Sequence, residues 1–169
     1  MANDNQAIKL LILDDSQNNA ERMVSLLRNA GHATRAHRVT SIEDLQECLQ
    51  QNWDICLAQT ETSYMTAEDA ITLIKRQSRD IPFILLKPEI DLEMRTEALR
   101  SGMTDAVPHD ADVLLTLIVD RELANLNARR QRRIVEQTLR EAEKRCQLLL
   151  DSSVDAIAYV HDGMHIYTN

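Results

Sequence analysis

Short apolar runs alternate with segments of helical periodicity over the first 120 residues of the chain. Residues 8–13 form an almost unbroken apolar run, whose length is typical of a buried parallel strand. The residues after it repeat apolar positions at i, i+3, i+4 and i+7: Ala20, Met23, Val24 and Leu27. This spacing predicts an amphipathic helix, and Gly31 is placed to end it.

The same alternation continues along the chain. Further strands are predicted at 33–39, 55–58, 83–86 and 106–107. Ser41 and Thr66 each precede an acidic residue by three positions, a pattern typical of a helix start. A fourth helix is predicted at 92–100, with Gly102 after it, and a long helix begins at Asp112.

Five strands that alternate with five helices predict an α/β fold: a doubly wound five-stranded parallel sheet, flavodoxin-like with strand order 2-1-3-4-5, followed by a long C-terminal helix. Sites in such folds lie outside the carboxyl ends of the strands. The polar residues at or just after those ends are Asp14, Asp15, Gln59, Lys87 and His109.

The long helix is expected to run to about residue 150, since no proline or glycine interrupts it. Its first apolar stripe is Val119, Leu123 and Leu126, and its second is Val135, Leu139, Ala142, Cys146 and Leu149. Nine residues separate the two stripes, which puts them out of heptad phase. Two interpretations stay open: a helix that dimerises, or a final domain helix that continues into a linker.

The last nineteen residues change character. Residues 156–160 are strand-like, Asp162-Gly163 is a hairpin turn signal, and residues 164–167 form the returning strand. Because a lone two-stranded hairpin is marginal in water, we expect the chain to be a piece of a longer protein. The predicted organisation is a domain at 1–120, a helical linker at 121–150 and the start of another domain at 151–169.

The charge is unevenly distributed. The net charge is −8; residues 1–120 hold 11 Lys/Arg against 20 Asp/Glu, and residues 121–145 hold 8 against 4. An acidic globule argues against nucleic-acid binding. No apolar segment is long enough for a signal sequence or a membrane span, and three cysteines without metal-ligand spacing are typical of reduced thiols. We expect a cytoplasmic protein without membrane insertion, metal or cofactor.

LLILDDS, DICLAQ, IPFILL and GMTDAV, at the expected strand ends, resemble a response-regulator receiver domain over residues 7–122. The resemblance implies an acidic pair for Mg²⁺ at Asp14 and Asp15, a phosphate acceptor at position 59, a Thr/Ser at 87, a Lys at 109 and a switch aromatic at 106. This chain instead has Gln59, Lys87, His109 and Ala106 at the last four positions.

The substitution at position 59 predicts a domain that takes no phosphate, because an amide is a far poorer nucleophile than a carboxylate. We expect the Lys87 ammonium to neutralise Asp14 and Asp15 in place of the metal. Alternatively, the two aspartates cap the first helix. Asp54 or Glu61 as a displaced acceptor is the other alternative, although Asp54 is at the wrong end of its strand.

DSSVDAIAYVHDGMHIYTN resembles the start of a PAS domain, and the whole chain resembles the N-terminal part of FimX-type cyclic-di-GMP signalling proteins. The resemblance implies a non-enzymatic module for localisation, dimerisation or partner docking. Its implied setting is the regulation of type IV pili and twitching motility, with protein partners at the cell pole. Cyclic-di-GMP would bind only through domains absent from this chain.

Two other assignments remain open or are disfavoured. The runner-up is a phosphorylatable receiver at the front of an active diguanylate cyclase or phosphodiesterase. A nucleotide- or flavin-binding module is disfavoured because no glycine-rich loop follows the first strand.

The expected docking surface comprises the fourth helix, the fifth strand and the long helix. Its apolar residues include Leu92, Ala98, Leu99, Leu115 and Val119. Most of these side chains are expected to lie in the core, which leaves the others for a partner.

Overall fold

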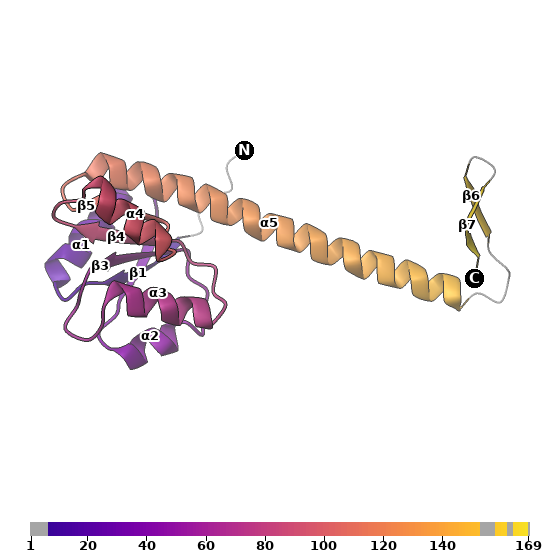
Figure 1. Cartoon of the computed structure of the whole chain (residues 1–169), viewed down its shortest axis with the longest axis horizontal. Coiled ribbons are helices and arrows are strands. Elements are labelled where there is room, and N and C mark those ends of the chain that lie inside the picture. Colours follow the sequence, from indigo (N-terminus) through magenta and orange to yellow (C-terminus); the bar gives the residue numbers. More distant parts are fainter. Residues whose placement is uncertain (1–6, 153–157, 162–163, 169) are drawn as a thin grey trace. The chain divides into compact units, whose positions relative to one another are not determined.

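The computed structural model describes residues 7–152, 158–161 and 164–168. It alternates strands and helices in the predicted order (Figure 1). The strands are β1 (Ile8–Leu13), β2 (Thr34–Arg38), β3 (Ile55–Gln59), β4 (Phe83–Lys87) and β5 (Asp105–Pro108). The helices are α1 (Gln17–Asn29), α2 (Ile42–Cys48), α3 (Ala67–Arg76), α4 (Leu92–Arg100) and α5 (Asp112–Asp151).

The five strands form one parallel sheet in the order β2-β1-β3-β4-β5, as predicted. Alternate residues of β1 face opposite sides of the sheet, as the pleat requires. Leu10 and Ile12 pack with residues of α1 and α5, whereas Leu11 and Leu13 pack with residues of α2 and α3. Both faces are therefore covered, which explains why the strands read as continuous apolar runs.

The helix boundaries follow the local capping chemistry. Ser41 and Thr66 cap α2 and α3 by accepting hydrogen bonds from the backbone N–H of Asp44 and Asp69, which confirms both predicted starts. Gly31 and Gly102 have positive φ angles of 96° and 86° just after α1 and α4, a conformation that glycine adopts without strain. Ser16 caps α1 by accepting from Asn19 N–H, so neither aspartate is the cap residue.

The first apolar stripe of the long helix belongs to the domain core. Val119 and Leu126 are buried, and Leu123 packs against the same core cluster as Val119. In the second stripe the exposed fractions of Val135, Leu139 and Leu149 are 64%, 57% and 66%. Nine residues along a helix correspond to a rotation of about half a turn. The phase break between the stripes is therefore a change of helix face.

The chain separates into two compact units, residues 1–126 and 127–169. In the second unit β6 (Ala158–His161) pairs antiparallel with β7 (Met164–Thr168), close to the predicted hairpin. The turn residues Asp162 and Gly163 lie outside the described residues. No described helix combines the length and the apolar character needed to cross a membrane.

Candidate functional site

Asp14 is the centre of the polar site at the carboxyl edge of the sheet. It directly follows β1, and its residue is only 3% exposed. Its Oδ1 accepts a hydrogen bond from Ser16 N–H at 2.7 Å, and its Oδ2 accepts one from the Asn19 side-chain amide at 3.3 Å. A buried carboxylate needs such donors, because desolvation without partners is costly.

Gln59 supplies the third donor to this carboxylate. It is the last residue of β3, and its Nε2 donates to Asp14 Oδ2 at 2.8 Å. The opposite orientation of the amide would place its oxygen against a carboxylate oxygen, so the donor assignment follows from electrostatics. The position predicted for the phosphate acceptor therefore carries a hydrogen-bond donor that is bonded to the neighbouring Asp14.

His109 lies beside Gln59, just after β5. Its Nδ1 is 3.5 Å from Gln59 Nε2, and its backbone N–H donates to the Lys87 carbonyl at 2.8 Å. The Arg22 guanidinium donates to the carbonyl of His109 and forms an ion pair with Asp112 at 2.8 Å. The imidazole Nε2 is buried without a hydrogen-bond partner among the described residues.

Asp15, the second member of the acidic pair, turns toward the loop after β3. Its two carboxylate oxygens accept from the backbone N–H and the hydroxyl of Ser63, at 2.8 and 2.9 Å. Unlike Asp14, Asp15 is exposed. The two carboxylates are thus held by different donors, and Ser63 was not among the residues singled out from the sequence.

Lys87 ends β4 and is half-buried. No ion pair within 4.0 Å joins its ammonium to Asp14 or Asp15 in the described part of the chain. The expected charge neutralisation by direct contact is therefore absent, and uncharged N–H donors hold both carboxylates instead. Strand periodicity places Lys87 at the correct edge but does not determine the direction of its long side chain.

The two displaced-acceptor candidates lie in other environments. The Asp54 carboxylate accepts from Lys9 N–H at 2.8 Å, and Asp54 N–H donates to the Lys9 carbonyl, before β3 begins. Glu61 is exposed and forms an isolated backbone bridge with Thr66.

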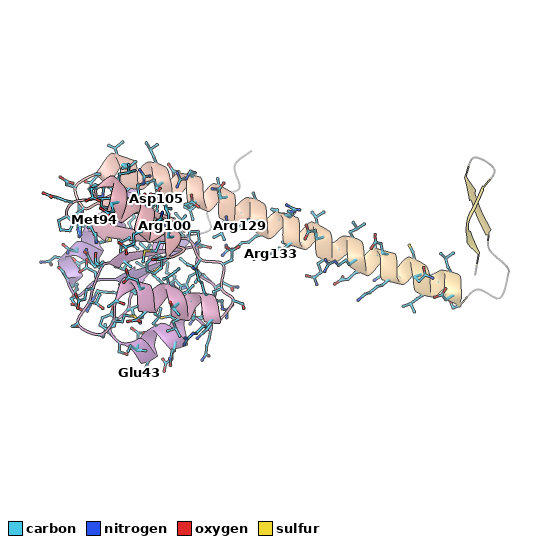
Figure 2. The ribbon with its side chains drawn as sticks, viewed as in Figure 1. Glu43, Met94, Arg100, Asp105, Arg129 and Arg133 are labelled. Carbon is cyan, nitrogen blue, oxygen red and sulfur yellow. The ribbon has the colours of Figure 1, made fainter. Side chains whose placement is uncertain are left out.

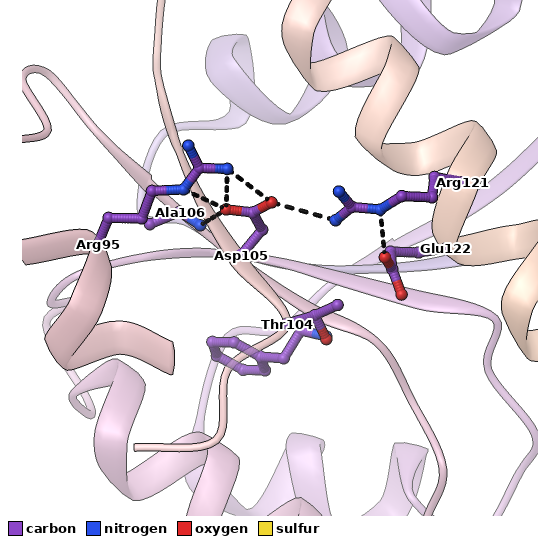
Figure 3. Close-up of polar contacts among 7 residues, drawn as sticks. Arg95, Thr104, Asp105, Ala106, Arg121 and Glu122 are labelled. Atoms are coloured by element: carbon purple, nitrogen blue, oxygen red, sulfur yellow. Dashed lines mark hydrogen bonds and ion pairs between the residues drawn. The ribbon is translucent and has the colours of Figure 1, made fainter. Parts of the chain in front are cut away.

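The switch position, Ala106, is buried within the core cluster on one face of the sheet. Its neighbour Asp105 is buried at the start of β5 and binds two guanidinium groups, Arg95 from α4 at 2.9 Å and Arg121 from α5 at 3.1 Å (Figure 3). Arg121 also pairs with Glu122 at 2.7 Å. The hydrogen bonds that Arg121 donates, first to Glu122 and then to Asp105, raise the pKa of Arg121. This ionic bridge connects α4, β5 and α5.

The sequence reasoning missed this bridge because its arginines are separated along the chain. Arg95 and Arg121 are 26 positions apart and read as solvent-facing helix residues. The available signal was Asp105, a charged residue next to the apolar pair Ala106-Val107 in a strand that the sheet buries. A buried carboxylate requires charged or N–H partners.

The expected docking surface divides into core and exposed residues. Ala98, Leu115 and Val119 are buried, whereas Leu92 and Leu99 on α4 are 81% and 49% exposed. Met94, labelled on α4 in Figure 2, is also exposed. The first two turns of α5 add three exposed apolar side chains: Val113, Leu114 and Leu117.

Comparisons with known proteins agree with this architecture. No family model matches the chain. The transcriptional regulatory protein PgtA of the phosphoglycerate transport system of Salmonella typhimurium is 27% identical over 140 residues. The match covers 80% of this chain, which spans about a third (33%) of that relative.

Solved structures of single domains match this chain over nearly the whole of their own length. The signal receiver domain of an HD domain-containing protein from Pseudomonas fluorescens superposes with a TM-score of 0.64 at 19% identity, covering 78% of this chain and 98% of that domain. The receiver domain of a signal transduction histidine kinase from Syntrophus aciditrophicus gives 0.59 at 25% identity, covering 70% and 92%. The chain therefore carries a receiver domain fold of the response-regulator type, and this likeness supports a role in signal transduction.

Proposed function

We propose that this chain is a pseudo-receiver, which binds protein partners and dimerises without being phosphorylated. The observation that carries the proposal is the 2.8 Å hydrogen bond from Gln59 Nε2 to Asp14 Oδ2. Aspartyl phosphate forms when a carboxylate oxygen attacks phosphorus, and the amide at this position has no such nucleophile. The acidic site is therefore closed by a hydrogen bond within the chain.

The donors on the acidic pair further support this proposal. Mg²⁺ prefers oxygen ligands in near-octahedral geometry. Here Asp14 already accepts from Ser16, Asn19 and Gln59, and Asp15 accepts from Ser63. An amide N–H in place of a third carboxylate supplies a hydrogen-bond donor where the ion would need a ligand, so the same residue removes the nucleophile and weakens the metal site.

The exposed apolar side chains of α5 support the dimerisation that forms part of this proposal. Val135, Leu139 and Leu149, in the second unit, recur at helical spacing and are 64%, 57% and 66% exposed. A second copy of the chain that packs against this stripe would bury these apolar side chains.

The wider setting is part of the same proposal. From the resemblance to FimX-type proteins we infer a cyclic-di-GMP signalling protein that regulates type IV pili and twitching motility, in the cytoplasm at the cell pole. Residues 151–169 are then the start of a PAS domain. In this setting the receiver fold binds neither nucleic acid nor a cofactor and has no enzymatic activity.

Intact-mass spectrometry after incubation with acetyl phosphate and Mg²⁺ tests the proposal. We expect no gain of a phosphoryl group by the wild-type chain, under conditions in which a phosphorylatable receiver in the same mixture is labelled. A stable gain on the wild-type chain would contradict the proposal. In that case Asp54→Asn and Glu61→Gln would identify the displaced acceptor of the alternative function.

A further inference from the structure

Three side chains with metal-binding atoms converge where β2 meets α2. His37 lies on the edge strand β2, and Asp44 and Cys48 lie one turn apart on α2. Asp44 Oδ1 is 2.9 Å from His37 Nε2 and 3.6 Å from Cys48 Sγ. The three ligand atoms all lie within 4.8 Å of one another.

We propose that His37, Asp44 and Cys48 bind one divalent transition-metal ion of the zinc type. Tetrahedral zinc with imidazole, carboxylate and thiolate ligands has neighbouring ligand atoms about 3.3 to 3.7 Å apart. The observed separations are 2.9 Å, 3.6 Å and at most 4.8 Å. Closing the widest edge requires a movement of about 1 Å, which side-chain rotation supplies without moving the strand or the helix.

The chemistry of the donors selects the class of ion. Imidazole and thiolate are soft or borderline ligands that suit Zn²⁺, Co²⁺ and Ni²⁺, whereas Mg²⁺ and Ca²⁺ take oxygen ligands. Binding replaces the proton on Cys48 Sγ with a sulfur–metal bond, and the proton is released to solvent. His37 contributes the lone pair of its neutral ring, so no oxidant or reductant is required.

Surrounding residues already orient the Asp44 carboxylate and contact the other two ligand residues. Asp44 Oδ2 accepts from the backbone N–H of Thr40 at 2.9 Å and from its hydroxyl at 3.2 Å, which leaves Oδ1 directed at the cluster. Trp53 Nε1 donates to the backbone carbonyl of Cys48 at 2.7 Å, and the Trp53 ring lies 6.2 Å from the His37 ring. Such outer contacts hold ligands in place and strengthen metal binding.

The cluster is open enough to admit an ion with a water as fourth ligand. The side chain of His37 is 44% exposed and that of Asp44 is 22% exposed, whereas the Cys48 residue is buried at 7%. A catalytic or regulatory zinc keeps one position for water, and three protein ligands with one solvent-facing side match that pattern.

A simpler explanation accounts for only part of the arrangement. A histidine–aspartate ion pair needs no cysteine, and the chain offers such a pair in His32 and Asp120, whose atoms lie 2.6 Å apart. The third ligand at Cys48 distinguishes the cluster from that pair. His32 and the exposed Cys146 therefore serve as matched controls.

The test is a titration of the reduced full chain with Co²⁺ in the absence of oxygen, followed by optical absorption. We expect one Co²⁺ per chain, visible bands of a tetrahedral ion and a near-ultraviolet band for charge transfer from thiolate to cobalt. Zn²⁺ should displace the Co²⁺. Cys48→Ser should abolish the charge-transfer band, and His37→Gln should weaken binding by at least about tenfold. His32→Gln and Cys146→Ser should leave both unchanged.

Two outcomes would overturn the proposal. One is the absence of a charge-transfer band at saturating Co²⁺; the other is a band that depends on Cys146 and not on Cys48. Because Cys48 is buried and its variant could unfold, circular dichroism of each variant accompanies the titration. His37→Gln, at a partly exposed position, keeps the test decisive if Cys48→Ser does not fold. Unchanged Co²⁺ affinity in folded His37→Gln would also refute the site.

Discussion

At the scale of single residues, the proposed loss of phosphorylation rests on the side-chain amide of Gln59. Gln59 at the end of β3 differs from a carboxylate in that it donates, and the nearest acceptor is the buried Asp14. A carboxylate in the same place would set two negative charges together at low exposure, an arrangement that raises the pKa of such a pair unless a cation intervenes. The amide removes this need for a cation.

Replacing Gln59 with leucine tests how strongly the amide holds Asp14. Gln59→Leu leaves Asp14 Oδ2 with only the 3.3 Å bond from Asn19, so the buried carboxylate loses its shortest side-chain donor. We expect the free energy of unfolding to fall by about 1–3 kcal/mol in urea titrations. Gln46→Leu, at an exposed position on α2, is the control and should change it by less than about 0.5 kcal/mol. Equal effects would show that the amide contributes nothing specific.

The three cysteines should differ sharply in reactivity. Burial first, and then the charge of Asp44, raises the pKa of Cys48 from 9.0 to about 11, and burial also raises the pKa of Cys56. Only the thiolate reacts. We therefore expect Ellman's reagent at pH 8 to label one exposed thiol per chain, Cys146, in the native state and all three in urea.

Cys146→Ser should abolish labelling of the native chain by Ellman's reagent, and a second thiol labelled in the native state would contradict the assignment.

The raised pKa values of Cys48 and Cys56 also affect the stability of the fold. The unfolded chain ionises these thiols at lower pH than the folded chain does. The contribution of Cys48 is therefore complete below pH 9 and is lost as the pH rises through about 11.

At the scale of elements, the bridge around Asp105 fixes α4 and α5 to the edge strand β5. Arg95 and Arg121 share the same buried carboxylate, so each compensates for the loss of the other. Their guanidinium groups are 43% and 52% exposed, and solvent screening makes each single contact modest.

A double-mutant cycle tests this shared dependence. We expect Arg95→Ala to lower the free energy of unfolding by about 1 kcal/mol or less. Arg121→Ala should lower it more, because it also leaves the buried Glu122 without its ion-pair partner. The double variant should lose more than the sum, by at least about 0.5 kcal/mol, since it leaves Asp105 buried without a cation. Strict additivity would mean that the two arginines act independently.

The second element-scale feature is the change of face along α5. Leu126 belongs to the core, whereas Val135, nine residues later, is exposed. Periodicity identified both stripes but did not distinguish a buried one from an exposed one, because the same spacing serves both. Burial was decided by the core cluster of β1, β4 and α1, against which Val119 and Leu123 pack.

At the scale of the whole molecule, the exposed stripe of α5 predicts self-association. Sedimentation equilibrium of the full chain should show a reversible dimer. Val135→Glu with Leu139→Glu should shift it to monomer by placing like charges in the apolar contact. Ile134→Glu, exposed on α5 but off the stripe, is the matched control and should leave the dimer intact. A wild-type chain that stays monomeric at all concentrations would remove the dimer from the proposed function.

The sequence alone determined the order of elements, the sheet topology, the caps at Ser41 and Thr66 and the absence of a carboxylate at position 59. These follow from local chemistry and from the periods of strand and helix, which act over a few residues. It also placed Asp14, Gln59, Lys87 and His109 at one edge, because parallel strands end together.

Only the tertiary structure decided which of these side chains touch. Gln59 binds Asp14 while the longer Lys87 does not pair with it, and the fold brings the ligand atoms of His37 and Cys48 within 4.8 Å of each other. Side-chain direction depends on how elements pack, whether they are neighbours along the chain, as β2 and α2 are, or far apart, and no local pattern records it. For that reason the closed acidic site, the Asp105 bridge and the three-ligand cluster emerged from the fold and not from the spacing of residues.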